Sequence, residues 1–253
     1  MNKPLSLSYR PDIDGLRALA VLLVIGFHYF PDSIPNGFLG VDVFFVISGF
    51  LITGIILRGL EADTFTIMDF YERRVRRIFP ALLVLLCAAI ILGWFLLIAI
   101  EYKQLTNHIS AAAIFVSNFL LWSEGDYFDN EAYTKPLLHL WSLAVEEQFY
   151  LIWPIVLMSL YRLSSKNTFI FILIFFSSSL LLQIILSVTN PTAAFYFPLA
   201  RAWELMVGAI LAYMTFHIRF ANLLLRVGEL KHITSLIGFA LLFSPLLLIS
   251  NAS

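Results

Sequence analysis

Long blocks of apolar residues dominate this sequence, and several reach about 20 residues with few or no charges. About 20 helical residues are needed to cross the roughly 30 Å hydrocarbon core of a bilayer. A soluble domain averages about 45–50% apolar and 25% charged residues, whereas this chain is 60% hydrophobic and 13% charged. Because backbone groups in lipid must be hydrogen-bonded within their own segment, helix is the expected spanning element. The sequence therefore predicts an all-α polytopic membrane protein, a bundle of about seven to eight transmembrane helices with no soluble domain.

Basic residues near the segment ends set the expected topology. Arginines follow the second apolar segment, and short loops rich in basic residues lie in the cytoplasm, so we place this loop and the N-terminus there. If all eight segments crossed, the loop with Arg162 and Lys166 would fall outside, against that rule. We therefore prefer seven spans, with Leu105–Trp122 re-entrant or buried, since Asn107 and His108 make it polar for a lipid-facing helix. The segments are Leu16–Phe30, Phe38–Leu57, Pro80–Ile100, Leu105–Trp122, Leu137–Leu160, Thr168–Val188, Pro198–Phe216 and Ile233–Ser250.

Charge and cysteine content narrow the choice of partners. The net charge is −1, whereas a nucleic-acid-binding surface normally brings a basic excess, so no nucleic-acid partner is expected. Cys87 is the single cysteine, so no intrachain disulfide can form. We treat residues 1–253 as one membrane domain. The chain ends directly after an apolar segment, which predicts that this domain is incomplete at its C-terminus.

The first segment contains two ionisable residues, and such residues in membrane helices are functional candidates by default. Arg17 and His28 are eleven positions apart, which places them on one helix face about 16 Å apart along the axis. Arg17 would lie near the cytoplasmic rim and His28 past the membrane centre. Arg17 is equally explained as a topogenic charge that snorkels to the interface, and His28 as a packing histidine. His28 is nevertheless the best catalytic candidate in the chain.

The second and seventh segments carry isolated charges. Asp42 is placed to orient or balance an imidazole on the first segment, or is simply a carboxylate stabilised by the helix dipole. Gly40 and Gly49 permit close approach of neighbouring helices. Arg201 and Glu204, at i and i+3, can neutralise each other, and a structural role is favoured for them.

An arginine cluster lies in the predicted cytoplasmic loop between the second and third segments. Guanidinium groups bind phosphates through forked hydrogen bonds, so the cluster is a candidate phosphate site. Positive-inside orientation and binding of anionic lipid explain the same residues. The cluster consists of Arg73, Arg74, Arg76 and Arg77.

The fifth segment carries a polar stripe. His139, Ser142, Glu146 and Tyr150 recur at helical spacing, and Glu147 lies on an adjacent face. Two adjacent carboxylates in a membrane helix suit proton exchange, because a charged carboxylate is costly there; a structural hydrogen-bond network is the alternative. No pair of histidines has the tight spacing of a metal-binding helix, so no metal is expected.

Several of these motifs together resemble one known family. Taken in order from about Tyr9 to Gly208, they are similar to the acyltransferase 3 family, bacterial membrane O-acyltransferases that act on lipopolysaccharide, peptidoglycan and other exported glycans. The positions that match the family's functional residues are Arg17, His28, Glu146 and the arginine cluster. The motifs are Asp14-Gly-Leu-Arg-Ala-Leu-Ala, Gly40-Val-Asp-Val-Phe-Phe-Val-Ile-Ser-Gly-Phe, Phe70-Tyr-Glu-Arg-Arg-Val-Arg-Arg-Ile-Phe-Pro and Leu140-Trp-Ser-Leu-Ala-Val-Glu-Glu-Gln-Phe-Tyr.

The resemblance implies a multi-pass protein of the bacterial cytoplasmic (inner) membrane that moves an acetyl group from cytoplasmic acetyl-CoA to an extracytoplasmic sugar hydroxyl. Acetyl-CoA is then a substrate, and no permanently bound cofactor is expected. Family members usually have further C-terminal helices, and some carry an extracytoplasmic hydrolase-type domain. The resemblance thus implies such a domain or protein as a partner, besides acyl-CoA, the cell-envelope glycan and the lipid bilayer.

Residues and resemblance combine into one predicted mechanism. Arg17 and the arginine cluster would bind the phosphates of coenzyme A. His28, assisted by Asp42 or Glu146, would act as general base on the sugar hydroxyl or as a transient acyl carrier, two roles that the sequence leaves open. A transporter or flippase, or a non-catalytic glycan- or lipid-binding protein, is the alternative. The predicted substrate network consists of His139, Ser142, Glu147 and Tyr150.

Overall fold

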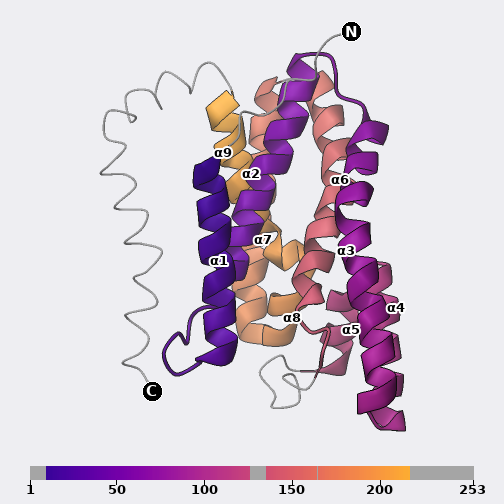
Figure 1. Cartoon of the computed structure of the whole chain (residues 1–253). Helices are drawn as coiled ribbons and strands as arrows, with labels where there is room; N and C mark the ends of the chain where they lie inside the picture. The colour runs from indigo at the N-terminus through magenta and orange to yellow at the C-terminus, as the bar shows by residue number, and fades with distance from the viewer. Residues whose placement is uncertain (1–9, 126–134, 164, 217–253) are drawn as a thin grey trace.

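The computed structural model describes residues 10–125, 135–163 and 165–216, and every regular element within these ranges is a helix. The expected all-α fold is therefore confirmed, while the apolar segment Ile233–Ser250 lies outside the described residues. One short helix, α8, falls between two predicted segments and was not expected. The helices (Figure 1) are α1 (Pro11–Tyr29), α2 (Leu39–Glu61), α3 (Ile67–Leu96), α4 (Ala99–Ala113), α5 (Ser117–Glu124), α6 (Leu140–Leu163), α7 (Ser165–Thr189), α8 (Pro191–Tyr196) and α9 (Pro198–Phe216).

Five of the described helices are long and apolar enough to cross a membrane, namely α2, α3, α6, α7 and α9. Helix α1 has 19 residues, but Asp12, Asp14 and Arg17 lie within its first two turns. The chain is thus a polytopic membrane protein, and the count of seven spans stays a prediction.

The segment Leu105–Trp122 forms two helices, α4 and α5, rather than one. The chain breaks between them, where Phe115 has a φ of 56°. The 15 residues of α4 extend about 22 Å, which is too short for a roughly 30 Å hydrocarbon core. Helix α4 lies beside the lower half of α3, and α5 packs against α6 (Figure 1). This arrangement agrees with the preferred re-entrant or buried segment.

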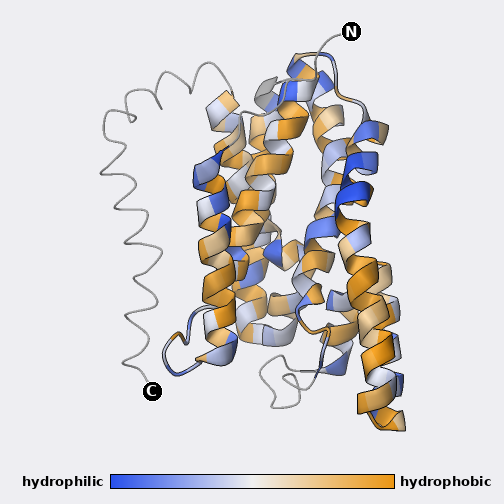
Figure 2. Ribbon diagram, viewed as in Figure 1, coloured by the Kyte–Doolittle hydropathy of each residue, from blue (hydrophilic) through white to orange (hydrophobic). Residues whose placement is uncertain are grey.

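The arginine cluster belongs to helix α3, which corrects the prediction of a loop. Helix α3 begins at Ile67, and the Thr66 side chain caps it by accepting a hydrogen bond from the backbone N–H of Asp69 at 3.3 Å. In Figure 2 the upper part of α3 is hydrophilic and its lower part strongly hydrophobic. The arginines therefore extend from a rigid helix that continues into the apolar region.

The bundle has two ends, which we name by the residues found near them. Helices α1 and α3 begin at the end where α2 finishes (Figure 1), and we call this the arginine end. The opposite end, where α1 finishes and α6 starts, is called the histidine end.

Glycines let the central helices pack backbone to backbone. A side chain at Gly49 would collide with the carbonyl of Leu205 on α9, and one at Gly208 would collide with the carbonyl of Val46 on α2. Gly40 lies in the same way against the backbone of α1. The predicted role of Gly40 and Gly49 in close helix approach is thus confirmed.

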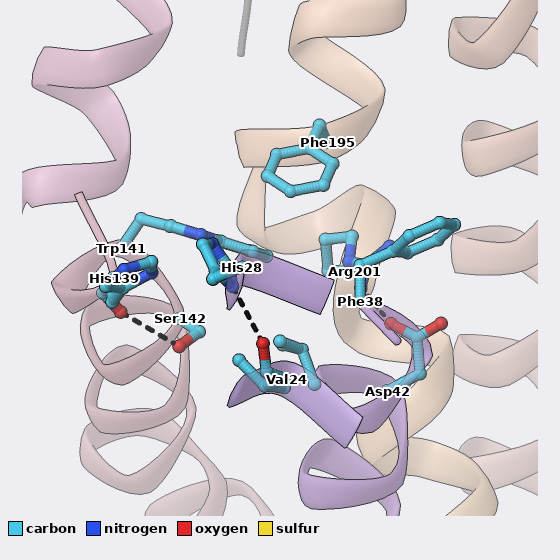
Figure 3. Close-up of a pocket in the computed structure, with 10 residues that line it drawn as sticks. Val24, His28, Phe38, Asp42, His139, Trp141, Ser142, Phe195 and Arg201 are labelled. Carbon is cyan, nitrogen blue, oxygen red and sulfur yellow. Dashed lines mark hydrogen bonds and ion pairs between the residues drawn. The ribbon is translucent and has the colours of Figure 1, made fainter. Parts of the chain in front are cut away.

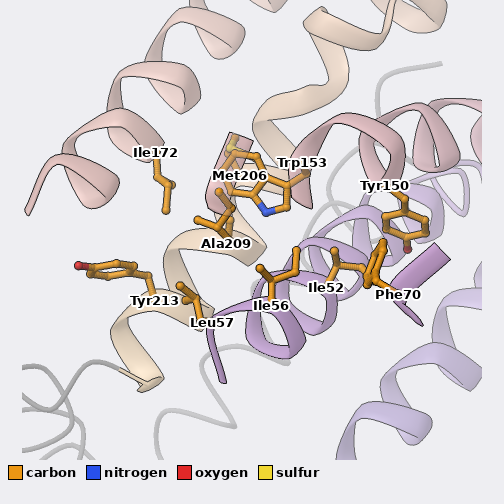
Figure 4. Packing of buried hydrophobic residues seen from close by; sticks show 11 residues of the cluster. Ile52, Ile56, Leu57, Phe70, Tyr150, Trp153, Ile172, Met206, Ala209 and Tyr213 are labelled. Atoms are coloured by element: carbon orange, nitrogen blue, oxygen red, sulfur yellow. The ribbon is translucent and has the colours of Figure 1, made fainter. Parts of the chain in front are cut away.

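A hydrophobic core joins α2, α3, α6, α7 and α9 on the arginine side of these contacts (Figure 4). Ile52, Ile56 and Met206 are fully buried in it. The indole N–H of Trp153 on α6 donates to the hydroxyl of Thr53 on α2 at 2.8 Å, so the buried polar groups of this contact satisfy each other. This core fixes α6 against α2 and α9 and so sets the geometry of the polar residues near the histidine end.

Candidate active site

A small cavity lies at the histidine end, where α1, α2, α6 and α9 meet (Figure 3). Its volume is about 60 Å³, which leaves room for a few water-sized groups. The wall combines an apolar, aromatic surface with ionisable groups from four separate stretches of the chain. The polar lining residues are His28, Asp42, His139, Ser142 and Arg201. The fold thus brings together four of the predicted site residues and adds Arg201.

The imidazole of His28 has one ring nitrogen fixed and the other free. Nδ1 lies 2.8 Å from the backbone carbonyl oxygen of Val24. Because a carbonyl only accepts, this contact favours the tautomer with the proton on Nδ1 and a lone pair on Nε2. Nε2 is buried and has no hydrogen-bond partner among the described residues. The ring packs edge-on against His139, with 4.4 Å between ring centroids. In this tautomer, Nε2 of His28 is an available base or nucleophile.

Arg17 and His28 lie in the same uninterrupted helix α1, so the separation of about 16 Å expected from their spacing applies. Arg17 is near the arginine end, half exposed, with its Nη1 3.9 Å from Asp14. The two residues do not meet in one site. They stand at opposite ends of α1, as the sequence predicted.

A buried ion-pair group stands beside the cavity. Arg201 on α9 binds Asp42 on α2 through Nη2, and the same nitrogen lies 3.2 Å from Glu204. The expected contact of Arg201 with Glu204 is present, but the contact with Asp42, 159 residues away, was not predicted. Asp42 shares the cavity with His28 and forms no hydrogen bond with it.

The polar stripe of α6 runs from this cavity toward the arginine end. Ser142 lines the cavity. One turn further on, Glu146 accepts hydrogen bonds from the hydroxyls of Ser48 and Tyr150. Glu146 forms no hydrogen bond with His28. It joins α2 to α6 about one turn from the cavity, toward the arginine end. The neighbouring Glu147 points to a different face, and its Oε1 is buried without a partner in the described part of the chain.

A second, larger cavity of about 550 Å³ lies between α3, the break after α4 and the middle of α6. It is mainly apolar, and its polar wall includes Arg74, Glu147, Gln148 and Tyr150. The guanidinium carbon of Arg74 stands 4.5 Å from the ring centroid of Tyr150. Because Tyr150 also binds Glu146, the polar stripe lies between the two cavities.

The other three arginines of the cluster face solvent rather than the bundle. Arg76 pairs with Glu72 at 2.8 Å, and both side chains are more than half exposed. Arg73 and Arg77 form no ion pair with any described residue. Of the four arginines, Arg74 alone lines the second cavity, while Arg77 is exposed but close enough to interact electrostatically with Glu147.

The contact that His108 forms was not predicted, although the residue was noted as polar for its segment. Nε2 of His108 lies 3.1 Å from Glu124, which also receives a hydrogen bond from Lys135 at 2.7 Å. Burial lowers the pKa of His108, and the nearby Glu124 carboxylate offsets this only in part. His108 is therefore mostly neutral at pH 7 and joins α4 to the end of α5. The polar character of this segment was the available signal for such a contact.

Apolar spanning helices around a small cavity lined by ionisable groups define a polytopic membrane protein. A protein-family model described as an acyltransferase domain matches residues 10–253. The chain therefore belongs to this acyltransferase family, and the resemblance to acyltransferase 3 proteins is confirmed.

Individual relatives agree with this assignment. The chain is 38% identical over 216 residues to the peptidoglycan O-acetyltransferase OatA of Listeria monocytogenes, covering 83% of this chain and 34% of that protein. It is 38% identical over 220 residues to the O-acetyltransferase OatA of Staphylococcus aureus, covering 85% and 36%. An uncharacterised protein of Haemophilus influenzae is 36% identical over 222 residues, covering 83% and 87%. The chain thus spans about a third of the OatA relatives, and no solved structure matches it.

Proposed function

We propose that this chain is a membrane O-acyltransferase that moves an acetyl group from acetyl-CoA at the cytoplasmic face to a hydroxyl of a cell-envelope glycan. The observation that carries the proposal is the unpartnered Nε2 of His28, whose ring lines a small cavity together with other ionisable groups in an acyltransferase-family chain. The names of the OatA relatives favour peptidoglycan as the acceptor. The cell location that goes with this reaction is the bacterial cytoplasmic membrane.

The arginine end is the proposed entry for the donor. Outward-facing guanidinium groups at the start of α3 supply forked donors for the phosphates of coenzyme A, and Arg17 adds a charge at the same end of the bundle. The apolar second cavity, with Arg74 at its wall, is long enough along α6 to take part of the pantetheine arm. The donor then points from the arginine end toward the histidine end.

The chemistry is assigned to His28. Nε2 accepts the proton of the attacking sugar hydroxyl, or it attacks the thioester carbonyl and carries the acyl group to the sugar. Asp42 is better placed than Glu146 to assist, because it lines the same cavity, and it acts through its charge rather than through a hydrogen bond. His139 and Ser142 complete the polar wall at which the hydroxyl is received. The cavity volume of about 60 Å³ suits an acetyl group better than a long acyl chain.

The test compares two histidine variants of the full chain in membranes supplied with radiolabelled acetyl-CoA and peptidoglycan glycan fragments. His28→Ala removes the proposed base, so transfer should fall by about 10²–10⁴-fold. His108→Ala is the matched control, since His108 is a buried histidine that lies outside the cavity; it should retain transfer in proportion to its folded amount. Wild-type transfer by His28→Ala would contradict the proposal. Acylation independent of His28 together with lost glycan export would instead indicate a transporter.

A further inference from the structure

Arg201 is a buried cation that faces the same cavity as His28. Its side chain is 10% exposed and reaches the cavity from α9. Figure 3 shows His28 in the middle of the site, with His139 and Ser142 on one side and Arg201 and Asp42 on the other. A full positive charge is costly in a membrane bundle and demands a reason beyond packing.

The ion pairs of Arg201 leave most of its donors free. A guanidinium group has five N–H bonds, but the contacts to Asp42 and Glu204 both use the Nη2 nitrogen. Nε is buried without a hydrogen-bond partner among the described residues, and the Nη1 nitrogen takes no part in either ion pair. Unsatisfied buried donors cost about 1–3 kcal/mol each. Such donors at the wall of a cavity are suited to an oxygen that becomes negative there.

The guanidinium group is also held in place. Its central carbon stands 5.7–5.8 Å from the ring centroids of Phe45, Trp141 and Phe195. These rings and the two carboxylates confine it on several sides, so little reorganisation is needed when charge develops nearby. A preorganised cation next to a free base is the arrangement that stabilises tetrahedral intermediates of acyl transfer.

We propose that Arg201 donates hydrogen bonds to the carbonyl oxygen of the transferred acyl group as this oxygen becomes an oxyanion. The inference rests on the proposed acyltransferase function. In the direct route, the sugar hydroxyl oxygen forms a bond to the thioester carbon, its proton passes to Nε2 of His28, and the carbonyl π electrons move to the oxygen beside Arg201. Collapse then re-forms the carbonyl and breaks the C–S bond, and the proton of His28 leaves with the thiolate as coenzyme A thiol.

The same oxyanion forms when Nε2 of His28 is itself the attacking atom, so the role of Arg201 is independent of the route. Asp42 and Glu204 act as positioning residues for the guanidinium group. The alternative role for Arg201 is to bind a carboxylate group of the glycan acceptor through the same donors. An oxyanion forms only in the transition state, whereas an acceptor carboxylate is bound in the ground state, so the two uses affect different kinetic constants.

The test is steady-state kinetics of acetyl transfer by the full chain in membranes, from radiolabelled acetyl-CoA to peptidoglycan glycan fragments. Arg201→Met should lower kcat by about 10²–10³-fold and leave KM for both substrates near the wild-type values. Arg201→Lys keeps the charge but loses the forked donors, so it should recover only part of kcat. Unchanged kcat, or a raised acceptor KM at wild-type kcat, would overturn the proposal.

Two further measurements keep the outcome interpretable. Arg58→Met is the matched control, because Arg58 on α2 stacks on Phe216 at 4.0 Å and lies outside the cavity; its kcat should stay unchanged. If Arg201→Met does not accumulate, Arg201→Lys alone decides, and a wild-type kcat in it contradicts the oxyanion role. Absence of transfer by the wild-type chain would reject the proposed function itself, whereas normal transfer with an indifferent Arg201 rejects only this inference.

Discussion

The two ends of the bundle hold their charges in different ways. At the histidine end, Arg201 and Glu204 are almost completely buried, and Arg201 pairs both with Asp42 on α2 and with Glu204 on its own helix α9. At the arginine end, the pair of Arg76 and Glu72 lies within one helix, and its side chains are 78% and 55% exposed. Both ends hold arginine–carboxylate pairs, but only the pairs at the histidine end are largely shielded from water.

This difference separates two tasks. Buried charges keep a fixed geometry, which acyl transfer requires at the reacting carbonyl. Exposed arginines on a helix are screened and mobile, which suits collection of a soluble, multiply charged donor but contributes little to folding. The comparison therefore predicts that substitutions at the histidine end affect stability and kcat, while those at the arginine end affect donor binding.

The largest expected effect is on stability and comes from Asp42→Asn. Removing one partner of a buried ion pair leaves Arg201 undercompensated and should lower the free energy of unfolding by about 3 kcal/mol. Thermal and denaturant unfolding of the purified protein in detergent would measure this loss. A change below about 1 kcal/mol would mean that the pair is effectively solvated, and the contrast between the two ends would fail.

The second-largest effect is expected on the binding of the donor, acetyl-CoA. Arg73→Gln combined with Arg77→Gln removes two outward guanidinium groups, and the KM for acetyl-CoA should rise about tenfold with kcat unchanged. High salt should raise the wild-type KM more than that of the double variant, because exposed charges are screened. Arg162→Gln, an exposed arginine in the last turn of α6, is the control. An unchanged KM in the double variant would show that these arginines do not bind acetyl-CoA.

The smallest effect is expected for Glu72→Gln. This change breaks an exposed i, i+4 pair in α3, which is worth only about 0.2–0.5 kcal/mol. Unfolding in the same detergent should therefore barely distinguish the variant from wild type. A loss as large as that of Asp42→Asn would show that exposure does not separate the two ends.

Local features of this fold followed from the sequence. Hydropathy and helical spacing gave the helices, the shared face of Arg17 and His28, and the close approach at Gly40 and Gly49, because each depends on one helix and its periodicity. The prediction that the arginine cluster lies in a loop was wrong. It rested on basic residues as a marker of topology, whereas the capping residue Thr66 indicates the start of a helix. Such features depend on neighbouring residues in the sequence, so they can be predicted without knowing which helices pack together.

The candidate site depended on contacts that spacing does not reveal. Asp42 lines the cavity with His28, but its ion pair with Arg201, made by packing of α2 against α9, was not predicted. Glu146 likewise binds Ser48, 98 residues away, rather than His28. The break at Phe115 carries neither glycine nor proline; it is held by α6, where the Gln148 amide donates to the Phe115 carbonyl at 2.7 Å. Tertiary partners therefore decided these features.

The central claim is that the donor enters at the arginine end and reacts at the histidine end. Sealed membrane vesicles of opposite orientation, each given radiolabelled acetyl-CoA only on the outside, test it most directly. Inside-out vesicles should acetylate glycan enclosed in their lumen, and right-side-out vesicles should show no transfer until they are made permeable. Equal transfer in both orientations, or transfer only in right-side-out vesicles, would contradict the account.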